Sequence, residues 1–291
     1  MLRSDTQSRD ALAKQISSWK GGIEPELGFW RRWMDTKGLE WPDDFTQRLQ
    51  HDTPLIHDVV RLLPPDMKNA IVLDVGSGPL SKIGKIVGDA RPRIISCDPL
   101  MSQYKLLLDE FGLVPLTECL QAPAEDLSSY FEPNFADVVH CSNALDHSFD
   151  PIRGIEEMLY VVKPTGAIVL LHATNEAENE NYEGFHQWNF DTEGDRFIVW
   201  NRSHRIDLNE HLDGVAHVVG SSSSDRRGVA AIIRKNPDRA EMVTALCDFR
   251  RKQRIAALHE TLLSVSLPVP SPQPESESQA ESEEEPMSAP I

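Results

Sequence analysis

A short glycine-containing segment is the strongest chemical signal in the chain. Asp74 ends an apolar run and is followed by Gly76, Ser77 and Gly78. Glycines directly after a strand let the backbone turn tightly and approach a ligand, with the amide groups of a following helix directed at it. Nucleotide-type ligands bind at such turns, beyond the carboxyl ends of the strands. Taken alone, the pattern also fits an ordinary loop between a strand and a helix.

An acidic residue at the end of the next apolar run strengthens this signal. Asp98 follows the run 93–97, and a carboxylate at such a position can accept hydrogen bonds from both hydroxyls of a ribose. Pro99 then stops the strand and restricts the backbone beside the carboxylate. A nicotinamide-dependent oxidoreductase would use these residues equally well, so the class of enzyme depends on residues further along the chain.

Strand-like and helical segments alternate through the middle of the chain and would place both acids at one edge of a sheet. This alternation predicts parallel βαβ units with right-handed crossovers. Later β-rich runs, joined by a serine-rich turn, predict a hairpin at the sheet edge. The expected strands are 71–74, 93–98, 136–141, 167–171, 197–200, 215–219 and 229–233, and the expected helices are 80–87, 103–111, 151–162 and 208–212.

The two ends of the chain differ from this middle region. Residues 1–69 predict a helical extension, in which aromatic residues such as Trp30 and Trp33 either pack onto the main domain or form a lid over a pocket. Asp43 could cap a helix there. Residues 236–267 include an amphipathic helix over 240–265. Residues 268–291 are rich in Pro, Ser and Glu, which predicts a disordered acidic tail, either solvated or partner-binding.

The composition limits the classes of partner. A formal net charge of −17 argues against a nucleic-acid surface, which needs clustered Lys and Arg. The 4 cysteines lack metal-ligand spacing, and Cys97 and Cys141 lie in apolar runs, as reduced core thiols do in the cytoplasm. No run approaches the about 20 apolar residues of a membrane span. We therefore expect a cytoplasmic protein that holds no metal and binds neither nucleic acid nor a membrane.

The order of the motifs resembles that of the class I S-adenosylmethionine-dependent methyltransferases, over roughly residues 70–235. Asp74, Gly76 and Gly78 match the acidic residue and the glycines of the family's first motif, while Leu80 stands at its last glycine position. This departure implies a bulkier wall near the methionine part of the cofactor. Segment 159–166 resembles the family's turn before its fifth strand.

The resemblance also implies which residues hold S-adenosylmethionine. Asp98 matches the family's ribose-binding acid, Leu100 matches the apolar residue beside adenine, and segment 122–127 looks like the one that holds the adenine amino group. The expected strand 136–141 resembles the family's fourth strand, and the loop after it contributes Asn143. The implied cofactor-binding residues are Asp74, Gly76, Ser77, Gly78, Asp98, Pro99, Leu100, Glu125, Asp126 and Asn143.

Two histidines are the candidate catalytic residues. His147 lies where this family often places a group that touches cofactor or substrate, and a neutral imidazole could take the proton of an attacking hydroxyl. It could equally be a structural residue of its loop. His186 lies beside Trp188 in a segment that suits a hydroxylated small molecule but also resembles an ordinary core. His172 is a further candidate.

These observations predict a Rossmann-like, doubly wound α/β fold with a mostly parallel seven-stranded sheet, an antiparallel edge hairpin and an N-terminal helical extension. Residues 70–235 would form the methyltransferase domain. The expected reaction is methyl transfer from S-adenosylmethionine to an oxygen of a small hydroxylated acceptor, such as a saccharide or secondary metabolite. An NAD-dependent oxidoreductase is disfavoured by the motif order. A catalytically silent binding protein is a third alternative, because a fold alone does not define a function.

Overall fold

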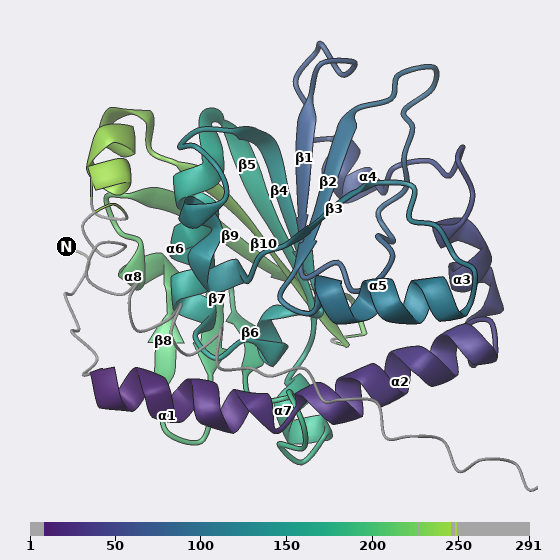
Figure 1. The fold of residues 1–291 in the computed structure, drawn as a ribbon. Coiled ribbons are helices and arrows are strands. Elements are labelled where there is room, and N and C mark those ends of the chain that lie inside the picture. Colours follow the sequence, from purple (N-terminus) through teal and green to yellow (C-terminus); the bar gives the residue numbers. More distant parts are fainter. Residues whose placement is uncertain (1–8, 226, 246–247, 249–291) are drawn as a thin grey trace, which may run out of the picture.

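A seven-stranded sheet forms the centre of the protein in the computed structural model, which describes residues 9–225, 227–245 and 248 (Figure 1). The strand order is β3-β2-β1-β4-β5-β10-β9, in which the first five strands are parallel and the last two form an antiparallel hairpin. The predicted fold class is therefore confirmed. The strands are β1 Ile71–Val75, β2 Arg93–Asp98, β3 Glu118–Gln121, β4 Ala136–Ser142, β5 Val162–Ala173, β9 Ala216–Ser222 and β10 Gly228–Lys235.

The central strands are apolar because both faces of the sheet are covered. In β1, Leu73 and Val75 belong to one buried cluster and Val72 belongs to another, as side chains of alternate residues must when they point to opposite faces. The strand order reverses between β1 and β4. A crevice opens at such a reversal, beyond the carboxyl ends of the strands. The topology therefore brings the ends of β1, β2 and β4 to one place.

Two long helices of the sheet region confirm the predictions. Helix α5 (Met101–Glu110) follows β2, and α6 (Pro151–Val161) follows β4. Pro151 stands in the first turn of α6, where its missing N–H is not needed, and the Asp150 side chain accepts a hydrogen bond from the amide of Arg153. The remaining short helices are η1 Ala124–Ser129, η2 Leu145–His147, α7 Glu176–Asn179, α8 Leu208–His211 and η3 Pro237–Arg239.

The helix predicted over 80–87 is wrong, because the backbone of this segment bonds to a distant part of the chain. The amide of Lys85 donates to the Thr53 carbonyl at 2.7 Å, and the amide of Leu55 donates to the Ile86 carbonyl at 2.8 Å. Gly84 has a φ of +87°, and a Cβ there would lie 2.0 Å from the carbonyl oxygen of Pro54. No helix therefore begins behind the glycine turn of β1.

The N-terminal helices pack against the sheet domain. In Figure 1, α1 (Arg9–Lys20) and α2 (Ile23–Asp35) lie end to end beneath the sheet, with α2 alongside α5. Trp33 and Met34 are buried in a cluster that also contains residues of α5. The predicted cap at Asp43 is wrong, since α3 (Pro42–Arg48) already begins at Pro42 and has no side-chain cap. Helix α4 (His57–Val60) completes the extension.

A second, smaller sheet lies beyond β5 and was not expected from the sequence. It contains β6 (Asn189–Glu193), β7 (Arg196–Trp200) and β8 (Arg205–Asp207), all antiparallel. Only β7 coincides with a predicted strand. Residues 240–245 are helical, while the rest of the predicted C-terminal helix and the predicted tail over 268–291 lie outside the described residues. Within the described part of the chain, no helix is long and apolar enough to span a membrane.

Candidate functional site

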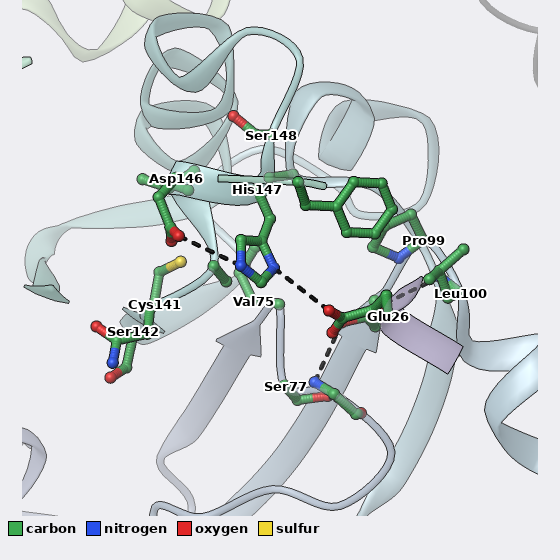
Figure 2. Close-up of a pocket in the computed structure, with 18 of the residues that line it drawn as sticks. Glu26, Val75, Ser77, Pro99, Leu100, Cys141, Ser142, Asp146, His147 and Ser148 are labelled. Carbon is green, nitrogen blue, oxygen red and sulfur yellow. Dashed lines mark hydrogen bonds and ion pairs between the residues drawn. The ribbon is translucent and has the colours of Figure 1, made fainter. Parts of the chain in front are cut away.

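One cavity of about 530 Å³ lies at the carboxyl ends of β1, β2 and β4, with the N-terminal helices as its opposite wall. Its lining contains every residue that the sequence singled out for the cofactor or for catalysis, except Asp126 and the further candidate His172. Figure 2 shows the part around Glu26, Ser77 and His147. These residues thus converge on one cavity, although they come from loops far apart in the chain.

The glycine turn after β1 depends on the absence of side chains. Gly76 and Gly78 have φ values of +68° and +62°, which L side chains rarely adopt. A Cβ on Gly76 would lie 2.3 Å from Ala144 Cβ, and one on Gly78 would lie 2.7 Å from the Trp30 ring. Two amides of the turn, at residues 76 and 77, donate to the Cys97 carbonyl. The turn is therefore fixed to β2, and its amides do not form the start of a helix.

Asp74 serves as a hydrogen-bonding centre beneath this turn. One of its carboxylate oxygens accepts from Ser81 Oγ at 2.6 Å, and the other lies 2.7 Å from Nδ1 of the buried His140. Both oxygens are thus engaged within the protein. The geometry makes Asp74 a residue that positions β1 and β4 relative to each other.

Asp98 presents a buried carboxylate at the end of β2. Its Oδ2 accepts from the amide of Gly78 at 3.1 Å, and its Oδ1 accepts from the amide of Leu100 at 2.9 Å. Burial raises the pKa of Asp98 to about 7, although the two amides favour its charged form. Each carboxylate oxygen can accept a second hydrogen bond. Pro99 and Leu100 continue the same wall of the cavity.

The two acids of segment 122–127 face different ways. Glu125 lines the cavity, and its Oε1 accepts from the amides of Phe149 and Asp150 at 3.0 and 3.3 Å. Burial raises the pKa of Glu125 to about 7. Asp126 is fully buried, does not line the cavity, and accepts from Ser129 Oγ at 2.8 Å. Of the two acids that the resemblance implied, only Glu125 can therefore contact a ligand in the cavity, because the backbone turn of η1 directs Asp126 into the protein interior.

Asn143 lies in the loop after β4 and links two strands. Its φ is +44°, its side-chain oxygen accepts from the amide of Ala173 at 2.9 Å, and its own amide donates to the Leu171 carbonyl at 2.9 Å. The side chain therefore holds the loop after β4 against the end of β5, at the wall of the cavity. Asn tolerates this left-handed backbone better than most residues.

Both candidate catalytic histidines meet at one carboxylate. His147 Nε2 lies 3.3 Å from Asp146 Oδ2, His186 Nδ1 lies 2.9 Å from the same oxygen, and the two ring nitrogens are 3.2 Å apart. Figure 2 shows the His147 ring between Asp146 and Glu26, whose carboxylate lies 3.9 Å from Nδ1. Burial disfavours charge on Asp146, yet His147 and His186 hold its pKa below the ordinary value. Asp146 in turn raises the pKa of His186 despite partial burial.

The N-terminal extension holds this histidine cluster in place. Trp19 Nε1 donates to the His147 carbonyl at 2.8 Å, and the Trp19 ring stacks on Phe185 with centroids 5.0 Å apart. The extension also contributes Glu26, Trp30 and other residues to the cavity wall. The N-terminal helices therefore pack onto the main domain and also line the cavity. Packing and a place over the pocket, the two alternatives for the aromatic residues, are thus compatible.

Other residues of the site were missed by sequence reasoning, and some expected ones lie elsewhere. Arg48 and Lys82 line the cavity and are the basic residues of its described wall; neither follows a strand, so only their charge could have marked them. Trp188 is buried in the main core, Leu80 packs among the N-terminal helices, and His172 stacks on Phe190, so none of these three lines the cavity. The expected bulky wall at Leu80 is therefore absent.

A family profile described as "Methyltransferase domain" matches residues 73–170, the stretch from β1 to β5. This match contains the glycine turn, Asp98 and the loop that carries Asp146 and His147. The chain carries an S-adenosylmethionine-dependent methyltransferase domain. Of the predicted functions, the enzyme class is thereby confirmed, and S-adenosylmethionine is the cofactor of this methyltransferase.

The methyltransferase also matches solved structures at low sequence identity. A protein named PH0226 from Pyrococcus horikoshii is 13% identical, with 59% of this chain and 84% of that chain covered and a TM-score of 0.38. An rRNA methylase from Streptococcus thermophilus is 14% identical, with coverage of 62% and 93% and a TM-score of 0.36. An S-adenosylmethionine-dependent methyltransferase from Clostridium acetobutylicum is 10% identical, with coverage of 67% and 91% and a TM-score of 0.37. No curated protein matches the sequence.

The cavity of the methyltransferase fits its cofactor in size and in chemistry. Its volume lies within the range typical of small-molecule sites. The Asp98 carboxylate retains lone pairs for two hydroxyl groups, and the turn at Gly76 and Gly78 allows close approach to the backbone. When bound, S-adenosylmethionine supplies a methyl group whose carbon is electrophilic, because it is bonded to a positively charged sulfur.

Proposed function

We propose that the methyltransferase transfers a methyl group to an oxygen of a small hydroxylated acceptor, such as a saccharide or secondary metabolite. One observation carries this proposal: the same cavity contains the glycine turn with Asp98 at one side and the Asp146, His147 and His186 cluster at the other. Binding cofactor and acceptor in one enclosed space supplies much of the rate of a displacement reaction, because the reacting atoms are held in line.

The cofactor half of the cavity is proposed to use residues of three loops. Asp98 would accept the ribose hydroxyls, while Leu100 and Glu125 would contact adenine. Since no helix begins at the glycine turn, the methionine carboxylate needs another positive partner. Lys82 and Arg48 line this cavity, and Arg48 is held in place by Asp44 at 2.8 Å and by the Leu80 carbonyl at 2.7 Å.

The acceptor half is proposed to use His147 and His186 as the catalytic residues. Both side chains are partly exposed to the cavity, while Asp146 between them is 2% exposed. His147 is not an isolated base, as the sequence suggested, because it shares Asp146 with His186. We assign contact with the acceptor hydroxyl to this cluster as a unit, with Trp19 as its positioning residue.

The shape and charge of the site support a small, uncharged acceptor. Aromatic side chains of the extension and of the loop before β6, among them Trp19, Trp30 and Phe185, line the cavity. Aromatic faces with a few polar groups suit the binding of sugars and other hydroxylated molecules. The net charge of −17 disfavours a nucleic-acid acceptor.

The proposal is tested by measuring formation of S-adenosylhomocysteine from S-adenosylmethionine in the presence of paired acceptors. Each pair contains a sugar or phenol and its amino analogue, and the position of the new methyl group is determined by NMR. We expect methyl transfer to oxygen with at least one hydroxylated acceptor, abolished in His147→Ala and His186→Ala. Transfer only to the amino analogues, or unchanged rates in both variants, would refute the assignment.

A further inference from the structure

Asp146, His147 and His186 form a compact triangle of ligand atoms at the acceptor end of the cavity. The three edges, between Asp146 Oδ2, His147 Nε2 and His186 Nδ1, measure 3.3, 2.9 and 3.2 Å. The residues come from η2 and from the loop that precedes β6. His186 is 39 residues from His147, so no local spacing in the sequence indicated the cluster.

Hydrogen bonds alone cannot make all three atom pairs of this triangle favourable. If both imidazoles donate to the Asp146 oxygen, two N–H groups face each other between His147 and His186. If His147 donates to His186 instead, the bare nitrogen of His186 faces the carboxylate oxygen, and two lone pairs meet. A neutral imidazole has one donor and one acceptor nitrogen, so every neutral arrangement leaves one edge repulsive.

A cation in the triangle would make all three edges favourable. Ligand atoms about 2.1 Å from one metal ion are separated by about 3.0 Å in octahedral geometry and by about 3.4 Å in tetrahedral geometry. The three observed distances lie within or beside this interval. The ligand atoms are thus already placed for an ion, without movement of the side chains.

The surroundings of the triangle also favour a positive ion. The second carboxylate oxygen of Asp146, Oδ1, is buried and has no hydrogen-bond partner. Glu176 and Glu180 line the same cavity, so carboxylates outnumber the basic groups at this end. Hydrogen bonds to their backbone carbonyls hold two of the ligand residues in place. Trp19 Nε1 donates to the His147 carbonyl at 2.8 Å, and the amide of Gln187 donates to the Asp146 carbonyl at 3.0 Å.

We propose that Asp146, His147 and His186 bind a divalent transition-metal ion, with two imidazole nitrogens and one carboxylate oxygen as ligands. This donor set favours ions such as Zn²⁺, Fe²⁺ or Co²⁺ over Mg²⁺ and Ca²⁺, which prefer oxygen ligands. Positions of the ion that face the cavity stay open to water or to a hydroxyl group. The proposal deepens the proposed function, since such an ion would hold the acceptor oxygen and make its hydroxyl group more acidic.

The test uses the untagged full chain, stripped with a chelator and titrated with Co²⁺ alone. We expect one ion per chain by calorimetry, visible absorption bands of a coordinated Co²⁺, and their loss on addition of Zn²⁺. His147→Ala, His186→Ala and Asp146→Asn should each weaken Co²⁺ binding by about tenfold or more. His211→Ala is the matched control, because His211 pairs with one carboxylate, Glu156 at 3.0 Å, but has no second histidine.

A second readout does not depend on the folding of the variants. In the wild-type chain, Zn²⁺ should shift the imidazole ¹⁵N resonances of His147 and His186 and leave that of His211 unchanged. Absence of a stoichiometric ion at millimolar Co²⁺, or binding that survives loss of both cavity histidines, would overturn the proposal. The methyl-transfer assay with paired acceptors separates the two hypotheses. If methyl transfer to oxygen occurs while no ion binds, only the metal site is refuted, and if an ion binds while methyl groups go only to the amino analogues, the proposed function is refuted.

Discussion

Replacement of Asp98 by Asn tests the cofactor site most directly. The change keeps the shape of the side chain but removes the charge that would accept the two ribose hydroxyls. A hydrogen bond to a charged group contributes about 1.5 to 3 kcal/mol, which corresponds to an about 10- to 150-fold weaker affinity for S-adenosylhomocysteine. The amide group would also place its NH₂ opposite the Gly78 or Leu100 amide, both of which donate to Asp98 in the wild type.

The pH dependence of binding gives this prediction a second, independent signature. Burial raises the pKa of Asp98 to about 7, and Glu26 on α2 and His147 on η2 are the nearby titratable groups that also influence it. Because the ribose hydroxyls favour the ionised carboxylate, ligand binding should lower this pKa. The affinity of the wild type should therefore fall as pH decreases below about 7, by up to about tenfold per pH unit. Asp98→Asn should lack this component.

Isothermal calorimetry with S-adenosylhomocysteine between pH 5.5 and 8.5 measures both effects. Asp126→Asn is the matched control, since Asp126 is a buried acid in the same region that does not line the cavity. Circular dichroism and thermal unfolding show whether each variant is folded. A folded Asp98→Asn variant with wild-type affinity and wild-type pH dependence would refute the assignment of Asp98 to the ribose.

Lys82→Gln should weaken the affinity for S-adenosylhomocysteine by about fivefold or more in calorimetry. The affinity for 5′-methylthioadenosine, which lacks the amino-acid part, should stay unchanged, and an equal loss for both ligands would contradict binding of the carboxylate by Lys82. Trp19→Phe removes the donor to the His147 carbonyl and should lower kcat with little change in S-adenosylhomocysteine affinity; an unchanged kcat would exclude the positioning role. Gly76→Ala should destabilise the fold by at least about 1 kcal/mol in urea unfolding, because of its positive φ and its contact with Ala144, whereas Gly28→Ala, with open space in α2, should be neutral or stabilising.

Local chemistry made the cofactor half of the site predictable. A strand that ends in an acid and two glycines needs the turn at Gly76 and Gly78, whatever surrounds it. Asp98 could be predicted for the same reason, because it ends the neighbouring parallel strand and must reach the same sheet edge. Alternating apolar runs likewise indicated the parallel βαβ units and the hairpin at the sheet edge. These features depend on neighbours in the sequence.

The loop that follows the glycine turn was decided by long-range contacts instead. Residues 80–87 are long enough for a helix between two strands, yet their backbone groups bond to residues 53–56. Hydrogen bonds between distant segments leave no periodic signal in either segment. For the same reason, Arg48 and Lys82 could not be connected with the cofactor, and the choice between Glu125 and Asp126 required the turn of η1.

The acceptor end shows the same division between sequence and tertiary structure. The sequence determined that His147 follows β4 and that His186 lies among aromatic residues. Only the packing of η2, the loop before β6 and the N-terminal helices brought both rings to a single oxygen of Asp146 and placed Trp19 behind them. The sequence specifies the type of each of these residues. Their hydrogen-bond partners depend on tertiary folding, because distances of about 3 Å between segments far apart in the chain exist only in the folded state.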